Sequence, residues 1–421
     1  MKAIVDCDSF YCSCERVFKP EINHKAIVVL SNNDGCIISR NTEAKALGIG
    51  MATPYYQLRE LIEKNKVSIF SSNYNLYGDM SQRVMAVLKI LAGEDKVEVY
   101  SVDESFLDLS HIAPESLESF ALQIKLTIEQ WTGVPVSIGI AATKTLCKVA
   151  NRFSKKNGKG VTILDSKEKI NEALENTKVE DAWGVGRPSA VKLKQQNILT
   201  AFELKNTNLE WARKNLGGVV GVRLVKELNG LACIPMKEAL EVKKMISSTR
   251  MFGRKVISRE ELREAVSSYV ARAAEKLRRQ LCVSGSIRVF LVTANTNKKI
   301  YAPESHGLEA KLPVATSVTS NLLEQALPLV DRLYKDGDVY LKAGVILSDI
   351  TPEDTVQQNF FTGADSACKK ELMRKMDNIN FSMRNEVIWF ASAGFLKKWR
   401  MRQDFISPRY TSRWEELKEV N

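Results

Sequence analysis

The sequence predicts an α+β protein built of several domains. Its 421 residues exceed what one hydrophobic core usually organises, so two to four domains are expected. The first 166 residues alternate apolar strands and helices in the order β, helices, ββαβαβ, which is typical of a mixed sheet with helices packed on one face. Residues 167–237 show only helical patterns, and residues 243–350 repeat strands and helices in the compact order βαββαβ.

The first region begins with a short apolar strand at 1–6 that ends on Asp6. SFYCSCERVF follows with helical spacing, and Asp8 lies just before it, where a carboxylate commonly caps a helix N-terminus. The segments IVVLS and GCIISRN predict strands on either side of the turn SNNDG. A helix over TEAKALG is predicted to begin at Thr42, and YGDMSQRVMAVLKIL has the pattern of a longer one.

Two strands, at 97–102 and 105–109, are predicted on either side of the acidic pair Asp103-Glu104. Successive side chains of a strand point to opposite faces, and a buried charge is costly unless it is paired or binds a metal. The pair therefore marks either a simple turn or half of a metal site. A helix at about 114–132, the strand VSIGIAA, the helix KTLCKVANRFSKK and the strand GVTIL complete the region.

The later regions have simpler patterns. Residues 167–237 are predicted to be helical, with a tight turn at Gly184 and Gly186 between two short helices. The βαββαβ module is predicted as strand 245–252, helix 259–280, strand 286–294, strand about 298–316, helix 319–335 and strand 339–348. Residues 351–421 show no clear sheet pattern.

Composition excludes several classes of protein. The eight cysteines form no C-x-x-C pair and only three histidines are present, so neither a zinc site nor a redox role is expected. The cysteines are expected to be small apolar residues of the core. Apolar runs fall short of the ~18–20 residues that span a bilayer, and KAIVDCD follows the first methionine without a leader pattern. A cytoplasmic protein is expected.

The formal charge of +11 indicates a polyanionic partner. Residues 243–350 contain 18 lysines and arginines against 11 acids, so much of the excess lies in one predicted module. A generally basic, solvated surface is the alternative interpretation, and composition alone does not separate the two.

Three acids are candidates for chemistry. Asp6 ends a buried strand, and Asp103 and Glu104 lie where one strand turns into the next, where twist or a bulge lets side chains approach one location. Three converging carboxylates repel each other unless cations neutralise them, and Mg²⁺ takes a few carboxylates together with substrate phosphates. Such a cluster suits two-metal phosphoryl transfer. The P-loop pattern GxxxxGK[ST] is absent, so the phosphates are not expected to be held as in P-loop NTPases.

The motifs IVDCDSFYCSCE, NTEAKALG, YSVDESFLDL, VSIGIAATKTLCKVAN and AWGVGRPSAVKL occur in an order that resembles the Y-family translesion DNA polymerases. VVLSNNDGCIISRN, FSSNYNLYGDMSQRVM and SPRYTSRW are similar to the UmuC branch, which comprises the catalytic subunit of bacterial DNA polymerase V and its plasmid-borne relatives. The resemblance runs from residue 1 to about 350 and returns in the last fifteen residues. It implies a right-hand polymerase. The palm is expected at 1–10 and 74–166, the fingers at 11–73, and a helical thumb with a helix-hairpin-helix at 167–237. A βαββαβ little finger is expected at 243–350, and a C-terminal region that binds partners and the clamp at 351–421.

The resemblance also implies the metal ligands and catalytic residues. Asp6 and Asp103 match the aspartates that bridge two Mg²⁺ ions, which Mn²⁺ could replace. Glu104 matches the acid that holds the catalytic ion near the primer 3′-OH, and the backbone carbonyl of Cys7 takes the place of the ligand to the nucleotide-bound ion.

Nucleotide contacts follow from the same resemblance. Tyr11 falls at the steric-gate position, where an aromatic ring blocks a 2′-OH, and Phe10 beside it is placed in the nucleotide site. Lys155 matches the basic residue that reaches the triphosphate. Thr42 and Lys45 stand where many members carry a tyrosine and an arginine, and lysine lacks bidentate geometry, so a looser clamp is expected. The alternatives are that Tyr11 packs on the core and that Lys155 is a basic helix end favoured by the macrodipole.

DNA contacts are implied in two places. The first is the helix-hairpin-helix turn of Gly184, Gly186 and Arg187, whose backbone N–H groups would face a phosphate; a plain loop is the alternative. The second is the start of the little finger, where the candidates are Arg250, Arg254 and Lys255.

Protein partners are implied by the C-terminal region. QQNFF resembles the short peptides that bind the bacterial sliding clamp, with Gln357, Phe360 and Phe361 as contacts, and packing of the two rings on their own domain is the alternative. SPRYTSRW implies contact with a UmuD′-like accessory dimer and a recombinase filament.

The predicted function is template-directed DNA synthesis past lesions in an SOS-type DNA-damage response, with dNTP and primer-template DNA as substrates. One alternative is a non-catalytic DNA-binding or scaffold subunit that acts through partners. The other is a palm-type nucleotidyl cyclase, which shares the acid-bearing hairpin but needs neither the turn at Gly184 nor a basic second module.

Overall fold

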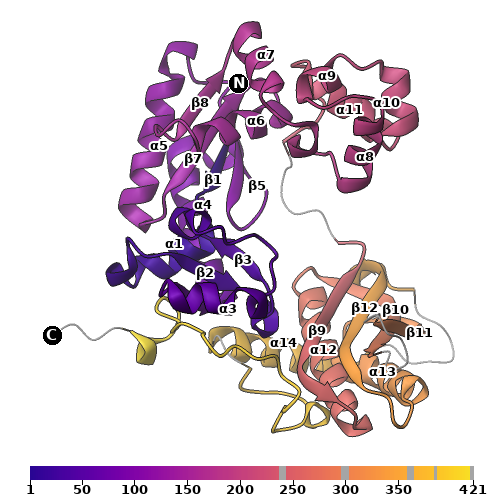
Figure 1. Ribbon diagram of the computed structural model, residues 1–421. Coiled ribbons are helices and arrows are strands. Elements are labelled where there is room, and N and C mark those ends of the chain that lie inside the picture. Colours follow the sequence, from indigo (N-terminus) through magenta and orange to yellow (C-terminus); the bar gives the residue numbers. More distant parts are fainter. Residues whose placement is uncertain (237–242, 295–302, 358–364, 384–385, 418–421) are drawn as a thin grey trace. The chain divides into compact units, whose positions relative to one another are not determined.

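The computed structural model describes residues 1–236, 243–294, 303–357, 365–383 and 386–417 (Figure 1). The chain divides into two compact units. The first comprises Met1–Leu30, Cys36–Leu240 and Phe405–Asn421, and the second comprises Ser31–Gly35 and Glu241–Asp404. Each unit combines sheet and helix, so the predicted α+β class is confirmed.

Five strands form the main sheet of the first unit, in the order β5-β6-β1-β7-β8. All neighbours are antiparallel except β7 and β8. The predicted order of strands in this region is confirmed. The bounds are Lys2–Cys7 for β1, Val97–Val99 for β5, Glu104–Asp108 for β6, Val136–Ala141 for β7 and Val161–Leu164 for β8.

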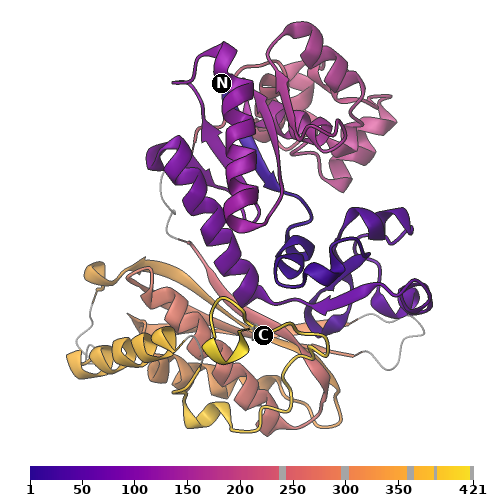
Figure 2. The ribbon, with the colours of Figure 1, turned by 90° about the vertical axis from the view of Figure 1, so that its left-hand side faces the viewer.

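Helices cover both faces of this sheet. Ala3 and Val5 of β1 share a hydrophobic core with α1, α4 and α5, and Figure 2 shows α4 and α5 in front of the strands. Ile4 points to the opposite face, where α6 lies. The prediction of helices on one face only is wrong, because the central strands are apolar at consecutive positions and both of their faces must be buried. The helices are α1 Phe10–Val17, α4 Tyr74–Ala92, α5 Leu117–Thr132 and α6 Lys144–Ser154.

A smaller sheet, in the order β3-β2-β4, completes the strands of the first unit. The predicted helix start at Thr42 is confirmed, and the Asn41 side chain caps that helix. The elements are β2 Ile27–Leu30, β3 Ile37–Arg40, β4 Ser68–Ser71, α2 Thr42–Ala46 and α3 Tyr55–Lys64.

The start of α1 differs from the prediction that Asp8 caps it. Ser9 precedes the helix in the left-handed conformation, with φ 46°, and no side chain caps the N-terminus. The Ser137 hydroxyl instead donates to the Asp8 carboxylate, with both oxygens at 2.9 Å. The turn at Ser9 therefore directs Asp8 toward β7 and away from the free N–H groups of α1.

The described residues of 167–237 form helices joined by loops, as predicted. The five helices share the hydrophobic core on the α6 side of the main sheet. They are α7 Lys167–Glu175, α8 Arg187–Gln195, α9 Ala201–Lys205, α10 Leu209–Asn215 and α11 Val219–Leu228.

The second unit contains a four-stranded antiparallel sheet in the order β11-β10-β12-β9, with α12 and α13 packed on its core. The predicted order βαββαβ is confirmed. C-terminal to it, α14 is tied to α12 by Arg278, which contacts Asp377 at 2.6 and 2.8 Å, and Trp399 is buried in the same core. The elements are β9 Ile246–Val256, α12 Arg259–Arg278, β10 Cys282–Thr293, β11 Glu304–Thr316, α13 Thr319–Leu333, β12 Tyr340–Pro352 and α14 Ala367–Ser382.

The burial of the cysteines and the character of the helices match what the composition predicts. Five of the eight cysteines are buried, in accord with their predicted role as small apolar residues. In the part of the chain that the structure describes, no helix combines the length and the apolar character needed to cross a membrane.

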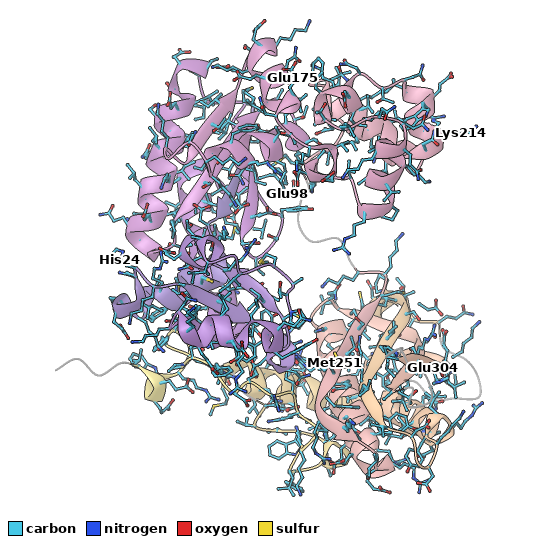
Figure 3. The ribbon with its side chains drawn as sticks, viewed as in Figure 1. His24, Glu98, Glu175, Lys214, Met251 and Glu304 are labelled. Carbon is cyan, nitrogen blue, oxygen red and sulfur yellow. The ribbon has the colours of Figure 1, made fainter. Side chains whose placement is uncertain are left out.

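An ion pair that the sequence did not predict is buried between β5 and α6. Lys144 contacts Glu98, which Figure 3 labels, and these side chains are only 2% and 5% exposed. Lys144 Nζ also donates to the Pro235 carbonyl at 2.8 Å and lies 4.9 Å from the centre of the Phe106 ring. The pair ties strand, helix and the chain after α11 together.

Removal of one partner of this pair is expected to be strongly destabilising. Glu98→Ala leaves the Lys144 ammonium buried without its counter-charge, so the free energy of unfolding should fall by about 3–5 kcal/mol. Urea titration measures it. The matched control is Glu94→Ala, because Glu94 is 84% exposed in its pair with Lys89 and such pairs contribute about 0–1 kcal/mol. Equal losses in the two variants would contradict the role of burial.

Candidate active site

The acidic pair lies at the hairpin that joins β5 to β6. The Ser101 hydroxyl donates to Asp103 Oδ1 at 2.6 Å and accepts from the Glu104 backbone N–H at 3.0 Å. The backbone N–H groups of Tyr100 and Ser101 both donate to the Glu104 carbonyl, at 3.1 and 3.0 Å. Asp103 thus belongs to the turn and Glu104 begins the strand, so strand alternation does not force the two side chains apart.

Asp6 lies directly opposite this hairpin. β1 and β6 are antiparallel, and Asp6 pairs in register with Glu104. The Cys7 N–H donates to the Asp103 carbonyl at 2.8 Å, which fixes the turn against the end of β1. Sheet register therefore brings together the backbones of the four residues that the sequence proposed as metal ligands.

Helix α6 presents polar and basic side chains to these acids. Lys155, which caps the helix C-terminus, places Nζ 2.7 Å from Asp6 Oδ1. Asn151 Nδ2 donates to Asp6 Oδ2 at 3.1 Å. Lys148 Nζ lies 2.5 Å from Glu104 Oε1, and both of these side chains are largely buried. Two ammonium groups therefore neutralise two of the three acids.

Lys148 and Asn151 were missed by the sequence interpretation, which named only Lys155. The three positions are separated by three and four residues, so they lie on one face of a helix, and this signal was present in KTLCKVANRFSKK. The sequence does not reveal that this face meets the acids. Gly139 of β7 permits the approach, because a Cβ there would lie 2.3 Å from the Asn151 backbone nitrogen.

The electrostatics of the site combine burial with opposed charge. Burial is the main cause that raises the pKa of Asp6, Glu104 adds to the rise, and Lys155 opposes it. Burial by itself lowers the pKa of Lys155, but the carboxylates of Asp6, Asp8 and Glu104 outweigh it and raise that pKa. The ionised form of these carboxylates is therefore stabilised by a nearby cation.

The residues fit a divalent cation in charge and in ligand type, since hard cations prefer carboxylate and carbonyl oxygens. Across the described ranges, however, no three Asp, Glu, Cys or His side chains are arranged so that they could hold a metal ion. Asp103 faces Ser101, while the lysines occupy Asp6 and Glu104. Metal binding by Asp6, Asp103, Glu104 and the Cys7 carbonyl stays a prediction.

Tyr11 stands on α1 beside two tyrosines of α4. Its ring stacks on Tyr77, with centres 4.6 Å apart and an interplanar angle of 20°, and meets Tyr74 edge-on at 6.0 Å. The ring is half-buried and packs against the core, as the alternative interpretation expected. A steric gate also requires a firmly held ring, and stacking on Tyr77 provides it.

The other predicted nucleotide contacts lie on α1 and α2. Phe10 is 3% exposed and belongs to the core, with its ring 5.7 Å from that of Tyr11. Thr42 and Lys45 lie on α2 with exposed side chains. The Ser9 hydroxyl donates to the Arg40 carbonyl at 3.0 Å, which ties the start of α1 to the end of β3.

The predicted DNA contacts are exposed in their own units. Gly184 has φ 99°, a conformation that favours glycine, and Gly186 and Arg187 begin α8 directly after it. Arg250, Arg254 and Lys255 are exposed on β9, where Arg254 is paired with Glu261. Of the predicted clamp contacts, Gln357 is exposed, and Phe360 and Phe361 lie outside the described residues.

Comparisons with known proteins agree with these motifs. The model of the impB/mucB/samB family matches residues 5–152, and the model of that family's C-terminal domain matches 243–360. A domain of unknown function (DUF4113) matches residues 370–420. Together the first two models cover more than half of the chain.

Curated relatives and solved structures give the same picture. Protein UmuC of Salmonella typhimurium is 38% identical over 100% of both chains. DNA polymerase IV 2 of Halalkalibacterium halodurans is 26% identical over 89% of this chain and 90% of its own. The solved structure of a Y-family DNA polymerase chimera of Dbh and Dpo4 superposes with a TM-score of 0.67 and 20% identity, over 84% of this chain and 100% of that one.

The structural likeness shows that the fold is that of the Y-family DNA polymerases, as predicted. The family models and the full-length identity to UmuC go further. The chain belongs to the impB/mucB/samB family.

Proposed function

We propose that the chain is a template-directed DNA polymerase that carries out translesion synthesis. The observation that carries this proposal is the acid-bearing hairpin of Asp103 and Glu104, held in register with Asp6 and faced by the lysines of α6. The reaction class is transfer of a dNMP from a dNTP to a primer 3′-OH. Its relatives named UmuC and DNA polymerase IV 2 support the assignment.

The residues of the chain have distinct tasks in this reaction. Bound Mg²⁺ would lower the charge on the attacking and leaving oxygens, with Asp6, Asp103, Glu104 and the Cys7 carbonyl as its ligands. Lys155 would leave Asp6 for the triphosphate, where a cation stabilises the charge that develops. Lys148 holds Glu104 in place while no cation is bound. Tyr11 would close the nucleotide pocket at the sugar, next to Phe10, Thr42 and Lys45.

Further assignments belong to the same proposal. The predicted palm, fingers, thumb and little finger keep the boundaries given above, and Mg²⁺ is the proposed metal. Proposed partners are a UmuD′-like accessory dimer, a recombinase filament and the sliding clamp, the last through Gln357 and the two phenylalanines after it. The proposed location is the cytoplasm, where the template DNA would be met.

Primer extension tests the function directly. The full-length protein is incubated with a primed template, intact or lesion-bearing, with the four dNTPs and Mg²⁺, with and without accessory subunits and clamp. Extension dictated by the template supports a polymerase. A cyclic nucleotide product would support the cyclase alternative. DNA binding without extension under every condition would support the scaffold alternative and contradict the proposal.

The basic strand β9 offers a separate test of DNA binding. Arg250→Ala combined with Lys255→Ala should weaken binding to DNA of any sequence, because phosphate contacts carry no sequence information. The slope of log affinity against log salt should become shallower by about 0.9 for each phosphate that the variant no longer neutralises. Fluorescence anisotropy between roughly 50 and 200 mM salt measures it.

The matched control for this prediction removes the same charge from the helical side of the second unit. Arg259 begins α12 and Lys335 follows α13, and both are exposed. Arg259→Ala with Lys335→Ala should leave the salt slope unchanged. If the two double variants change the slope equally, the effect is one of net charge, and β9 is not a specific contact surface.

A further inference from the structure

The last described part of the chain packs inside the first unit. The Ser71 N–H donates to the Phe405 carbonyl at 3.0 Å, and the Phe405 N–H donates to the Ser71 hydroxyl at 3.0 Å. Tyr410 is 6% exposed, and its ring stacks on Phe18, which directly follows α1, with centres 4.7 Å apart. We call residues 405–410 the C-terminal strap. Ser407 and Tyr410 of the strap are buried beside α1, whereas Phe405, Ile406 and Pro408 are exposed.

Ser407 of the strap enters a buried hydrogen-bond network. Its hydroxyl donates to Glu15 Oε1 at 2.8 Å and accepts from Asn73 Nδ2 at 3.1 Å. The Tyr77 hydroxyl donates to the same Glu15 oxygen at 2.7 Å. Glu15 is on α1, while Asn73 and Tyr77 belong to the start of α4, so one serine joins both helices.

The network is buried and depends on few hydrogen bonds. Glu15 is fully buried, Tyr77 is 1% exposed and Ser407 is 5% exposed. The second carboxylate oxygen of Glu15, Oε2, is buried and has no hydrogen-bond partner among the described residues. The two hydroxyl groups that donate to Oε1 therefore offset the desolvation of the Glu15 carboxylate. Loss of either donor would destabilise the fold, because a buried polar atom without a hydrogen bond is costly.

The network ends at the proposed gate. The Tyr77 ring, whose hydroxyl is fixed by Glu15, is the surface on which the Tyr11 ring stacks at 4.6 Å. Stacked rings constrain each other, so a shift of Tyr77 is passed to Tyr11. A chain of contacts thus runs from Ser407 through Glu15 and Tyr77 to Tyr11.

We propose that Ser407 and Glu15 are positioning residues for the nucleotide gate, and that the strap holds the Tyr11 ring through Tyr77. This gives a task to the end of the segment matched by the domain of unknown function. The inference rests on the proposed polymerase function and on Tyr11 as the gate. It predicts that the strap influences sugar selectivity, although none of the proposed nucleotide contacts belongs to the strap.

Sugar selectivity is the first readout. In Ser407→Ala and in Tyr77→Phe, the ratio of kcat/KM for a dNTP to that for the matching rNTP should fall about tenfold. Each variant removes one hydrogen bond of the network that holds the Tyr77 ring, and the free energy of such a bond, about 1 kcal/mol, corresponds to a factor of this order. The kcat for the dNTP should change by less than about threefold. Ser407→Thr keeps the hydroxyl and should restore the ratio.

The control is Ser392→Ala, which removes an exposed serine from the same C-terminal region. It should leave the ratio unchanged. A general loss of folded protein would lower both rates and keep their ratio, so it cannot imitate the expected result. An unchanged ratio in both Ser407→Ala and Tyr77→Phe, with dNTP incorporation intact, would overturn the proposal.

The second readout needs no polymerase activity. Burial raises the pKa of Glu15 to about 7, against the hydrogen bonds from Tyr77 and Ser407 and the charge of Lys19, which lower it. Other titratable groups that face Glu15 are Tyr410, Cys12 and Cys14. Because this pKa is raised in the folded state, the contribution of Glu15 to stability is full below its unfolded pKa and is lost as pH rises toward 7.

Ser407→Ala removes a donor that favours the ionised form, so the pKa of Glu15 should rise further. The loss of Tm relative to the wild type should then be about 2–3 °C larger at pH 8 than at pH 5. Glu15→Gln should abolish that difference when it is combined with Ser407→Ala. A Tm loss that is equal at the two pH values would show that Ser407 does not act on Glu15. This result would contradict the inference even if the protein extends primers. A failed extension assay would contradict the proposed polymerase function and would leave the measured Tm difference unchanged, so the two failures can be told apart.

Discussion

Asp103→Ala is expected to lower the rate of primer extension by about a thousandfold or more while DNA affinity stays within about twofold. The reason lies in the hairpin geometry: the Asp103 carbonyl accepts from the Cys7 N–H at the end of β1, so Asp103 lies in the turn that faces this strand end. The other acid of the hairpin, Glu104, pairs with Asp6 and has its own proposed role as a ligand. Removal of one preorganised electrostatic group commonly costs about 10²–10³ in kcat. As a ligand of both proposed cations, Asp103 would affect more than one contact.

Two measurements make this result specific. Single-turnover extension gives the rate, and anisotropy with labelled primer-template gives the affinity. Asp108→Ala is the matched control, because Asp108 lies at the opposite end of β6 from Glu104 and accepts a hydrogen bond from the Ser110 N–H at 2.9 Å. Wild-type-like extension by Asp103→Ala would eliminate the proposed mechanism, and a comparable loss in Asp108→Ala would point to folding of β6.

The main features of the fold were predictable because they depend on local patterns. The acidic pair interrupts an apolar run, and the apolar residues on both sides fix the positions of β5 and β6. The βαββαβ order likewise follows from apolar periodicity in each element. The motif order was specific enough to identify the family, and the full-length identity to UmuC agrees with it.

The features that were missed depend on contacts between segments far apart in the chain. Lys148 could be placed on the same helix face as Lys155, but only the close approach of α6 at Gly139 brings it to Glu104. Ser407 lies 392 residues from Glu15, and no local pattern in SPRYTSRW predicts that its serine is buried beside α1. Asp8 was misassigned for a related reason, since its partner Ser137 comes from another strand.

Tyr11→Ala is expected to admit ribonucleotides. A ring placed against the 2′ position rejects a 2′-OH by steric overlap, which typically costs about 1–3 kcal/mol. This corresponds to about 5–150-fold in the ratio of dNTP to rNTP kcat/KM. The ratio should fall by that factor because kcat/KM for the rNTP rises. A loss confined to dNTP incorporation would instead indicate a damaged site.

Tyr11→Phe separates the ring from the hydroxyl. It keeps the surface that stacks on Tyr77 at 4.6 Å, so sugar selectivity should stay within about twofold of the wild type. If Tyr11→Ala leaves selectivity unchanged, Tyr11 is a core residue and not the gate, and the strap then has no gate to position. If Tyr11→Ala opens the pocket while Ser407→Ala does not, the ring discriminates the sugar without support from Ser407.

The double variant tests whether Ser407 acts through Tyr11. Once the Tyr11 ring is removed, Ser407→Ala should have no further effect on selectivity, because the effects of coupled residues are non-additive whereas those of independent residues add.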